Sequence, residues 1–427
     1  MYFMLIFMEK LNFDSEGRVM ADPRKNLIAR PLYLEVIKAY IDVPVVKILA
    51  GIRRCGKSSI LQMLKQELIA KGIMSEAIIT RRYTSLDIPE NFSARDMYDD
   101  LKKGMRAGEK CYLLLDELQE IEGWEKVVDS LLEDDGADIY VTGSNSKLMS
   151  SEISTYLSGR YVLIPVYTLS FAEFIEFRKG RKGGELDERE LLADYLRFGG
   201  FPIIAAGDFD ERTAYQIVEG IYTSVITNDI ARRHTIPSQE LFDRTVRFIV
   251  QNVGKTFSTN TIVNFLKNER RALSVETIYN YLIWLEKAFV IYRCQRYDLQ
   301  GKSILKTQEK FYLADPSLKY CMFGFNPVGL AAMLENLVYF ELRRRGYDVY
   351  IGKLGTREID FVAMKRGERI YVQVCRNLPE DSDREVVNLL AINDHYPKYV
   401  VTLDDLASGN IEGVQIVHLR DFLLGRV

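Results

Sequence analysis

Apolar runs of about five residues alternate, between residues 30 and 166, with segments whose apolar positions recur every three or four residues. The runs "CYLLL" and "DIYVT" contain almost no polar residue, which is typical of strands buried on both faces. Strands of this kind alternating with helices predict an α/β fold, a parallel sheet with helices on both faces. The predicted strands are 45–50, 77–82, 111–115, 138–142 and 161–166, and the predicted helices are 59–71, 94–104, 124–134 and 147–157.

A different pattern begins at about residue 168. The amphipathic helices "SFAEFIEFRK" and "RELLADYLRFGGFP" flank "RKGRKGGELDE", which we interpret as a solvated loop, with a basic contact point as the alternative. Three helices and two strands then follow, which is the order of a winged helix, and a small α/β unit comes last. The predicted division is an N-terminal extension (1–29), an α/β domain (30–166), a helical region (167–238), a winged-helix-like domain (239–315) and a second α/β domain (316–427).

The composition is that of a soluble protein, with 47% apolar and 27% charged residues, and 427 residues are enough for about three domains. A net charge of −3 excludes a protein that coats nucleic acid through bulk charge, so such a contact needs a local basic patch. The five cysteines form no C-x-x-C pair and suit a reducing compartment. With three widely separated histidines, a zinc site is not expected.

The apolar run at residues 1–8 is too short to cross a bilayer and lacks the basic segment and the cleavage site of a signal peptide. It is either an additional strand or the product of a translation start placed upstream of the true one, since Met8 and Met20 are also available. We favour the second interpretation. No later segment reaches the length of a membrane span, so we expect a cytoplasmic protein with no membrane partner.

The stretch "ILAGIRRCGKSSILQML" matches the pattern G-x-x-x-x-G-K-[ST] between a predicted strand and a predicted helix. Glycines permit the backbone angles that turn successive N–H groups towards an anion, and the start of the helix adds the positive end of its dipole. Lys57 supplies a charge for the β- and γ-phosphates, and Ser58 supplies a hydroxyl for Mg²⁺. The residues predicted to hold the nucleotide are Gly51, Ile52, Arg53, Arg54, Cys55, Gly56, Lys57, Ser58 and Ser59.

The stretch "CYLLLDELQ" places two carboxylates at the end of a buried strand. Asp116 is predicted to hold Mg²⁺ together with Ser58, and Glu117 to act as the general base that activates water. An acidic pair after a strand is common, so this prediction depends on the phosphate loop that precedes it.

Two further residues are candidates for catalysis. Asn145, after the strand in "IYVTGSNSKL", is the candidate to sense the γ-phosphate or to orient water, and a cap of the next helix is the alternative. Arg160, just before the fifth strand, is the candidate to neutralise transition-state charge on the nucleotide of its own or a neighbouring subunit, and a surface ion pair is the alternative.

Together these segments resemble the prokaryotic AAA+ ATPases that are joined to the domain of unknown function 4143. The resemblance covers about residues 30 to 403. It implies a P-loop AAA+ module, a winged helix and a C-terminal unit similar to restriction endonucleases, with ATP as the nucleotide and no assigned biological role. The segments that carry it are "GIRRCGKSS", "LLLDELQ", "VTGSNSKLMSSEISTYLSGR", "LSFAEF" and "YLRFGGFP".

The C-terminal unit departs from the endonuclease pattern, which has a helix glutamate, a strand aspartate and then E-x-K. Glu335 and Asp360 match the first two positions, but the third strand carries Gln373 and Cys375 in place of the glutamate and the lysine. A neutral amide is a poor Mg²⁺ ligand and a thiol does not replace an ammonium, so we expect the fold without nuclease activity.

The winged-helix-like domain leaves DNA binding open. Its third helix presents polar residues but also Glu276, which opposes phosphate, so protein–protein packing is the alternative. The basic residues that would contact a DNA backbone are Lys267, Arg270, Arg271, Arg293 and Arg296.

The leading hypothesis is an Mg²⁺-dependent ATPase whose hydrolysis of ATP switches the winged helix and the C-terminal domain. One alternative is an ATP-gated nuclease, and another is a nucleotide-dependent scaffold or regulator with negligible turnover. DNA as a partner and assembly into a homo-oligomer stay open.

Overall fold

The structure of the chain is a computed structural model. It describes residues 27–427 with the exception of 107, 135, 145–155, 158, 183–185, 269–272 and 379–383. Residues 1–26 of the predicted extension, Asn145, Arg270 and Arg271 lie outside the described residues, as does most of the predicted helix 147–157.

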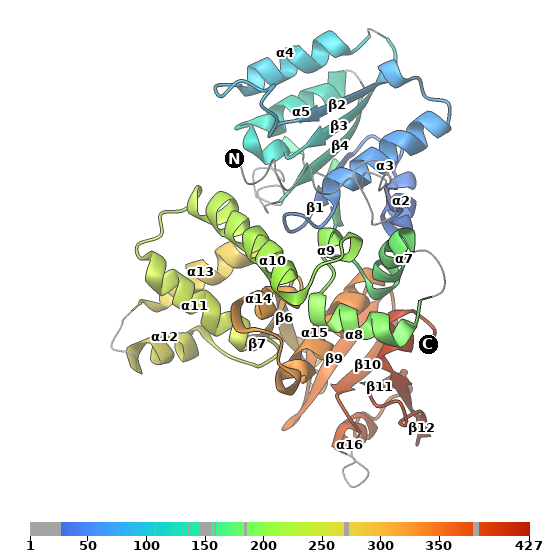
Figure 1. Cartoon of the computed structure of the whole chain (residues 1–427), viewed down its shortest axis with the longest axis vertical. Helices are drawn as coiled ribbons and strands as arrows, with labels where there is room; N and C mark the ends of the chain where they lie inside the picture. Colours follow the sequence, from blue (N-terminus) through green and yellow to red (C-terminus); the bar gives the residue numbers. More distant parts are fainter. Residues whose placement is uncertain are drawn as a thin grey trace.

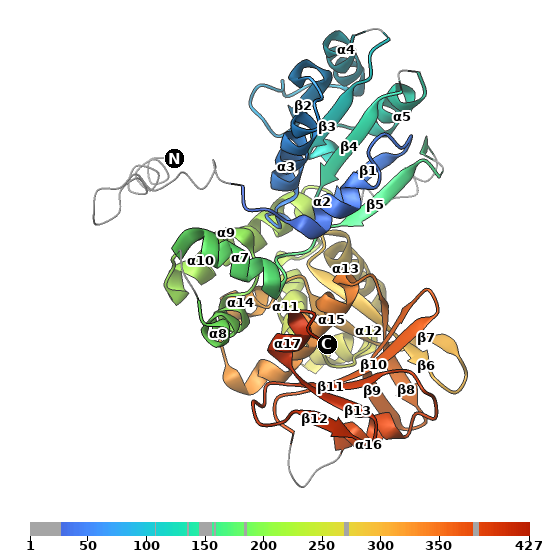
Figure 2. The ribbon, with the colours of Figure 1, turned by 90° about the vertical axis from the view of Figure 1, so that its right-hand side faces the viewer.

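The first sheet has five parallel strands in the order β2-β3-β4-β1-β5, so the fold class that the sequence predicts is confirmed. Each strand begins and ends within one residue of its predicted bounds. Figure 2 shows helices α3 and α5 on either side of the strands. The elements are α2 (Pro31–Lys38), β1 (Val46–Ala50), α3 (Lys57–Ala70), η1 (Ser75–Ala77), β2 (Ile78–Arg82), α4 (Ala94–Gly104), β3 (Tyr112–Asp116), η2 (Leu118–Glu120), α5 (Trp124–Asp134), β4 (Asp138–Gly143) and β5 (Tyr161–Pro165).

A helical region follows the first sheet (Figure 1). Two of its helices begin at aspartates that cap them. Asp187 accepts a hydrogen bond from the backbone N–H of Arg189, and Asp210 accepts one from the backbone N–H of Thr213. The α-helix α10 continues into one turn of π-helix, which is rare and often marks a functional site. The elements are α7 (Phe171–Lys182), α8 (Glu188–Phe198), α9 (Pro202–Ala206), α10 (Glu211–Val225) and the π-helix η4 (Ile226–Ala231).

Helix α8 ends at Gly199, and the turn of Gly199 and Gly200 lies in close contact with the C-terminal half of the chain. Gly199 has φ +74°, and a Cβ there would lie 1.9 Å from Oδ1 of Asp315. The backbone N–H of Gly200 donates to Oδ2 of Asp315 at 2.8 Å. This turn therefore needs glycine both for its left-handed backbone and for the approach of a buried carboxylate.

Three helices and a two-stranded ribbon come next, in the predicted order. Ser274 caps the third helix by accepting a hydrogen bond from the backbone N–H of Thr277 at 3.0 Å, and Ser258 accepts one from that of Thr261 at 3.4 Å. The elements are α11 (Gln239–Gln251), α12 (Thr259–Asn268), α13 (Val275–Lys287), β6 (Ile291–Asp298) and β7 (Ser303–Leu313).

The ribbon is the edge of a second sheet of eight strands, in the order β12-β13-β11-β10-β9-β8-β6-β7. Strand β6 pairs in parallel with β8, so the predicted boundary at 315/316 falls inside one hydrogen-bonded sheet. The division into domains itself stays a prediction. The elements are α14 (Ser317–Phe323), η5 (Pro327–Gly329), α15 (Leu330–Arg344), β8 (Asp348–Leu354), β9 (Arg357–Lys365), β10 (Glu368–Cys375), α16 (Arg384–Leu390), β11 (Lys398–Thr402), β12 (Gly409–Ile411), β13 (Val414–His418) and α17 (Leu419–Leu423).

Buried apolar side chains run without a break from the first sheet through the helical region to helix α15. A smaller cluster lies between β9, β10 and α16. Within the part of the chain that the structure describes, no helix combines the length and the apolar character needed to cross a membrane.

Candidate nucleotide site

The loop between β1 and α3 has the backbone of an anion site. A Cβ at Gly51 would lie 2.0 Å from the carbonyl oxygen of Val166, so only glycine fits there. Gly56 has φ +103° and precedes the first residue of α3, so no side chain caps the first N–H groups of that helix. These N–H groups and the helix dipole are therefore available to a phosphate.

Lys57 spans this loop. Its Nζ donates to the carbonyl oxygens of Gly51 at 2.8 Å and of Ile52 at 3.1 Å, and the residue is only 3% exposed. The ammonium is thus held at the rim of the loop, where a phosphate bound to the N–H groups would meet it.

The two residues predicted to hold Mg²⁺ are in contact. The hydroxyl of Ser58 donates to Oδ1 of Asp116 at 3.0 Å, and Thr142 on the neighbouring strand β4 donates to the same oxygen at 2.5 Å. The helix that starts at Lys57 and the end of strand β3 together bring a hydroxyl and a carboxylate to one place, which is a ligand set that suits Mg²⁺.

Glu117, the predicted general base, has a left-handed backbone (φ 56°, ψ 46°). Its Oε2 accepts hydrogen bonds from Nε2 of Gln119 at 2.5 Å and from Oγ of Ser144 at 3.3 Å. Burial alone would raise its pKa, but the charge of Lys57 and the bond from Gln119 outweigh burial, so the pKa of Glu117 lies below its usual value. The carboxylate is therefore ionised and able to accept a proton.

Sequence analysis missed Asp229, which the π-helix brings to this site. Its carboxylate is 1% exposed and accepts hydrogen bonds from Nε of Arg53 at 2.6 Å and from Nη2 of Arg53 at 3.0 Å. Ser144 also donates to it, at 3.0 Å. One feature of the sequence could have indicated this residue. Asp229 follows the apolar residues Val225 and Ile226 by four and three positions, so on a helix it lies on their buried face.

Arg160 lies at the other end of the sheet from the loop. Its carbonyl oxygen accepts a hydrogen bond from the N–H of Val46, the first residue of β1, and the phosphate loop follows the last residue of that strand. Five strand residues separate these ends by about 16 Å. The side chain pairs with Asp129 at 2.6 Å and with Glu133, so it does not reach the loop of its own chain.

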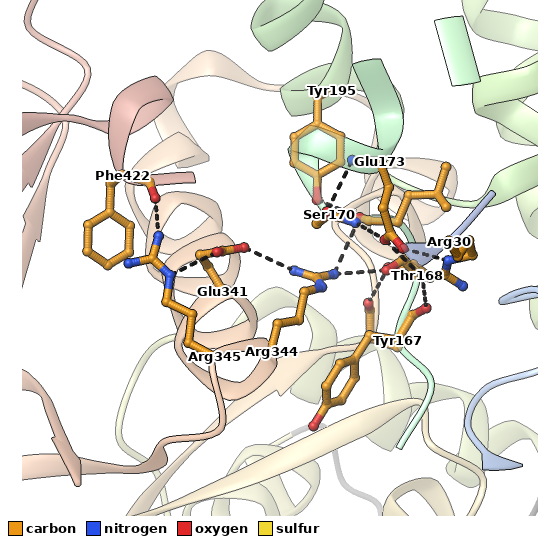
Figure 3. A network of polar contacts seen from close by, with 12 residues as sticks. Arg30, Tyr167, Thr168, Ser170, Glu173, Tyr195, Glu341, Arg344, Arg345 and Phe422 are labelled. Carbon is orange, nitrogen blue, oxygen red and sulfur yellow. Dashed lines mark hydrogen bonds and ion pairs between the residues drawn. The ribbon is translucent and has the colours of Figure 1, made fainter. Parts of the chain in front are cut away.

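Arg30, just before α2, contacts both the loop and α7, and Figure 3 shows it beside Glu173. It is 1% exposed, and its Nη1 donates to the carbonyl oxygen of Cys55 at 2.7 Å. Its charge is paired with Glu173 of α7 at 2.7 and 2.9 Å. Arg344 of α15 approaches the segment between β5 and α7, donating to the carbonyl oxygen of Thr168 at 2.9 Å. Polar contacts thus connect the loop with α7. They also connect the segment between β5 and α7 with α15 of the C-terminal sheet domain.

The predicted endonuclease-like residues also meet, around a lysine that the sequence did not single out. Nζ of Lys310 lies 3.1 Å from Glu335, 3.0 Å from Glu358 and 3.8 Å from Asp360. Burial and the nearby charge of Glu335 raise the pKa of Asp360 well above its usual value. Gln373 bonds to the backbone of Asp360 at 3.1 Å. Among the described residues, no three His, Cys, Asp or Glu side chains converge as metal ligands would.

The two arginines predicted to contact DNA from the ribbon have protein partners. Arg293 pairs with Glu286 and Glu309, each at 2.8 Å, and Arg296 donates to Gln308. Lys267 is exposed at the end of α12. Arg293 and Arg296 therefore do not form an exposed basic surface on the ribbon.

A glycine loop follows the inner parallel strand β1, and a lysine and a serine open the helix after it. An aspartate ends the buried strand β3, which is separated from β1 by β4 alone. This arrangement defines a P-loop nucleotide-binding protein. Two family models match the chain: an AAA domain over residues 44–175 and a domain of unknown function, DUF8612, over residues 189–328. The second is DUF8612 rather than the domain 4143 that we expected, and it covers the middle of the chain rather than the C-terminal unit.

An uncharacterized protein of Haemophilus influenzae is 37% identical over 401 residues, which cover 94% of this chain and 99% of that protein. The chain therefore belongs to the same family as that protein. The uncharacterized protein MJ1544 of Methanocaldococcus jannaschii is 29% identical over 80% of this chain and 77% of its own. A Walker-type ATPase of Pyrococcus abyssi shares the fold, with a TM-score of 0.50 and 16% identity over 73% of this chain and 99% of its own.

Proposed function

We propose that the chain binds ATP with Mg²⁺ at the loop 51–58 and hydrolyses the bond to the γ-phosphate. The observation that carries this proposal is the hydrogen bond between Ser58 and Asp116, with the ionised Glu117 next to Asp116 and within the electrostatic influence of the buried Lys57 ammonium. The AAA domain over residues 44–175 supports ATP as the nucleotide.

The residues fit both the nucleotide and the metal. Gly51 and Gly56 leave room for phosphate against the backbone, and Lys57 supplies a positive charge. Ser58 and Asp116 would hold Mg²⁺, which when bound neutralises charge on the phosphate oxygens. Glu117 accepts a proton from water as the water oxygen bonds to the γ-phosphorus. The bond from phosphorus to the bridging oxygen breaks, and its electron pair leaves with ADP.

Two substitutions test this proposal. Lys57→Ala is expected to lose ATP binding in calorimetry, because the loop loses its charge. Glu117→Gln is expected to bind ATP and lose turnover, because an amide does not accept the proton. Glu122→Gln is the matched control, since Glu122 is exposed five residues further on. Turnover by Glu117→Gln at the rate of Glu122→Gln would contradict the role of Glu117.

We propose further that the nucleotide state changes the contacts of the helical region and the C-terminal sheet domain. The support is the set of polar contacts through Arg30, Glu173 and Arg344, which begins at the carbonyl oxygen of Cys55 within the loop. Hydrogen exchange measured with ADP and with ATP, in the Glu117→Gln background, is expected to differ in α7 and α15. Equal exchange in both states would contradict the switch.

We propose that Arg160 acts on the nucleotide of a neighbouring subunit, because the phosphate loop of its own chain lies at the far end of the sheet. This predicts that specific ATPase activity rises steeply with protein concentration and that Arg160→Ala abolishes the rise. The same titration with added duplex DNA tests DNA as a partner. An activity independent of concentration and of DNA would exclude both from the mechanism.

For the C-terminal unit we propose an endonuclease-like fold without hydrolysis. The support is Lys310, whose ammonium lies among Glu335, Glu358 and Asp360, where carboxylates of a nuclease would hold a cation. Incubation of plasmid DNA with Mg²⁺ and the parent chain is expected to give no more cleavage than the Asp360→Ala variant gives. Cleavage lost only in that variant would overturn this proposal.

We also propose the cytoplasm as the location. The five cysteines are all free thiols, which suits a reducing compartment that holds ATP. Fractionation of cells that express the full chain, with markers for each compartment, tests this proposal.

A further inference from the structure

We propose that Arg53 contacts the γ-phosphate of the nucleotide bound to its own chain, and that Asp229 positions the guanidinium for this contact. The inference rests on the proposed ATPase function and adds a catalytic residue and a positioning residue to it. It also assigns a function to the π-helix at residues 226–231, which carries Asp229.

Arg53 belongs to the phosphate loop itself, two residues after Gly51 and four before Lys57. Its side chain points to the end of the site that holds Glu117 rather than to the Arg30 side. Nη2 of Arg53 bonds to Oδ1 of Asp229 at 3.0 Å, Ser144 donates to that same oxygen at 3.0 Å, and Ser144 Oγ is 3.3 Å from Oε2 of Glu117.

Glu117 is the proposed acceptor of the proton from the attacking water, so the γ-phosphate must lie next to it. A guanidinium that is separated from Glu117 by two small hydrogen-bonded groups therefore lies at the γ-phosphate end of the loop. Glu120 adds a second carboxylate 4.0 Å from Arg53 on the same side.

The pair with Asp229 leaves part of the guanidinium for another anion. Asp229 takes Nε and Nη2, which form one edge of the planar group, while the N–H groups on Nη1 lie outside that pair. A guanidinium can thus be oriented by a carboxylate on one edge and donate to phosphate from the other. The side chain of Arg53 is 19% exposed, so it is reachable from the loop.

Burying the ion pair between Arg53 and Asp229 costs free energy of desolvation, which favours a functional role for the pair. The side chain of Asp229 is fully buried, and an ion pair out of water is a weak source of stability. It also sits on a π-helix, a form that is less favourable than an α-helix and often occurs at functional sites.

The chemistry needs a cation at this place. As the water oxygen bonds to the γ-phosphorus and its proton passes to Glu117, the bond to the bridging oxygen breaks and the electron pair moves to ADP. Charge shifts among oxygens that an arginine can contact, and stabilising that charge is the recurring task of arginine in such reactions. Arg160 of the same chain is too distant for this task, whereas Arg53 is part of the loop.

The experiment compares Arg53→Ala, Arg53→Lys and Asp229→Asn in the full chain, with kcat and KM from steady-state ATPase assays. A second measurement is the retention of labelled ADP in the presence of aluminium fluoride and Mg²⁺, which mimics the transferring phosphoryl group. The matched controls are Arg81→Ala and Asp100→Asn. Arg81 and Asp100 form the same kind of two-bond pair at 2.7 and 3.4 Å, away from the loop.

Arg53→Ala is expected to lower kcat by about 10²–10³-fold and to lose ADP–aluminium fluoride retention, while ADP alone binds within about threefold of the parent chain. Arg53→Lys keeps a charge and is expected to recover part of kcat. Asp229→Asn keeps the shape of the side chain and is expected to lower kcat by about tenfold without further loss in the double variant with Arg53→Ala. The Arg81 and Asp100 variants are expected to behave as the parent chain does.

Two results would overturn the inference while the ATPase proposal stands: turnover by Arg53→Ala at the parent rate, or loss of ADP binding in Arg53→Ala as complete as in Lys57→Ala. The second result would make Arg53 a part of the binding loop and not a catalytic residue. The ATPase proposal itself fails in a separate way, if the parent chain and Lys57→Ala hydrolyse ATP equally slowly. Thermal unfolding of every variant shows whether it is folded, and a destabilised Asp229→Asn leaves the Arg53 variants to decide.

Discussion

The buried pair between Arg30 and Glu173 gives a sharp prediction for stability. Glu173→Gln removes one charge and leaves the other in place. Arg30 is 1% exposed and Glu173 is 9% exposed, so the remaining guanidinium stays out of water. It stays there because Nη1 and Nη2 are also bonded to the carbonyl oxygens of Cys55 and Tyr167, at 2.7 and 3.1 Å.

The magnitude follows from what Glu173 supplies. Its carboxylate accepts three hydrogen bonds, from Nε and Nη2 of Arg30 at 2.7 and 2.9 Å and from the backbone N–H of Ser170 at 2.9 Å. In glutamine one of the two oxygens becomes an NH₂ group that faces donors. Breaking a buried pair in this way costs about 3–5 kcal/mol. For a unit of roughly 200 residues, this cost lowers the melting temperature by about 10 °C.

The assay is thermal unfolding followed by circular dichroism, with Glu176→Gln as the control on the same helix. Glu176 pairs with Lys179 at 3.0 Å but is 61% exposed, so its loss is expected to cost less than about 1 kcal/mol. Burial alone would raise the pKa of Glu173, but Arg30 outweighs it and the pKa lies below its usual value. The carboxylate is thus ionised from pH 6 to 8, and the deficit of Glu173→Gln is expected to be constant there.

A double substitution distinguishes the effect of the unpaired charge on stability from the effect of altered packing. The double substitution Arg30→Met with Glu173→Leu removes both charges, and such replacements are often neutral or stabilising. It is expected to melt well above Glu173→Gln. Equal melting of Glu173→Gln and Glu176→Gln would refute the reasoning, since it would mean that the guanidinium is not left unpaired in a dry environment.

Three further predictions follow from single features. Gly51→Ala is expected to lose ATP binding in calorimetry, because a Cβ would lie 2.0 Å from the carbonyl oxygen of Val166; binding like that of the parent chain would mean that the loop can move aside. Ser274→Ala is expected to cost about 1 kcal/mol in denaturant unfolding, because it removes the cap that the N–H of Thr277 uses at 3.0 Å. Asp360→Asn is expected to melt higher than the parent chain, increasingly so from pH 5 to pH 8. The pKa of Asp360 is raised by burial and by Glu335, so the folded parent binds more protons than the unfolded chain, and it loses stability as the pH rises. A constant difference between the two across this range would contradict that reading of Asp360.

The first sheet was predictable because β1, β3 and β4 are buried at every residue and therefore form nearly continuous apolar runs. The second sheet was predictable only in part. The segments of β8, β9 and β10 are visible in the sequence, but β6 pairs with β8 over a separation of 55 residues between Arg296 and Ile351, and no local pattern specifies such a partner. The strands β12 and β13 are three and five residues long and were not predicted.

The same distinction divides the candidate site. Lys57, Ser58, Asp116 and Glu117 could be named because each belongs to a short motif next to a strand. Asp229 could not, because it lies 176 residues from Arg53 and its own surroundings look like an ordinary apolar helix. The role of a buried charge is decided by its partner, and a partner at this distance appears only once the chain is folded.

The ion pairs of Arg53, within the loop, and of Arg30, which is bonded to the loop, indicate which part of the chain would respond to a bound nucleotide under the proposed switch. Arg53 pairs with Asp229 in the π-helix that follows α10, and Arg30 pairs with Glu173 on α7. Both connections therefore lead into the helical region, and neither leads to the three-helix segment. Helix α10 packs against α14, and the turn before α9 is bonded to Asp315, which precedes α14. A displacement of the loop would therefore reach the second sheet by way of α10 and α14. On this argument the ribbon β6–β7 moves with the sheet to which it is bonded and not as an independent wing, so substitutions in α10 are expected to affect coupling more than substitutions in α13.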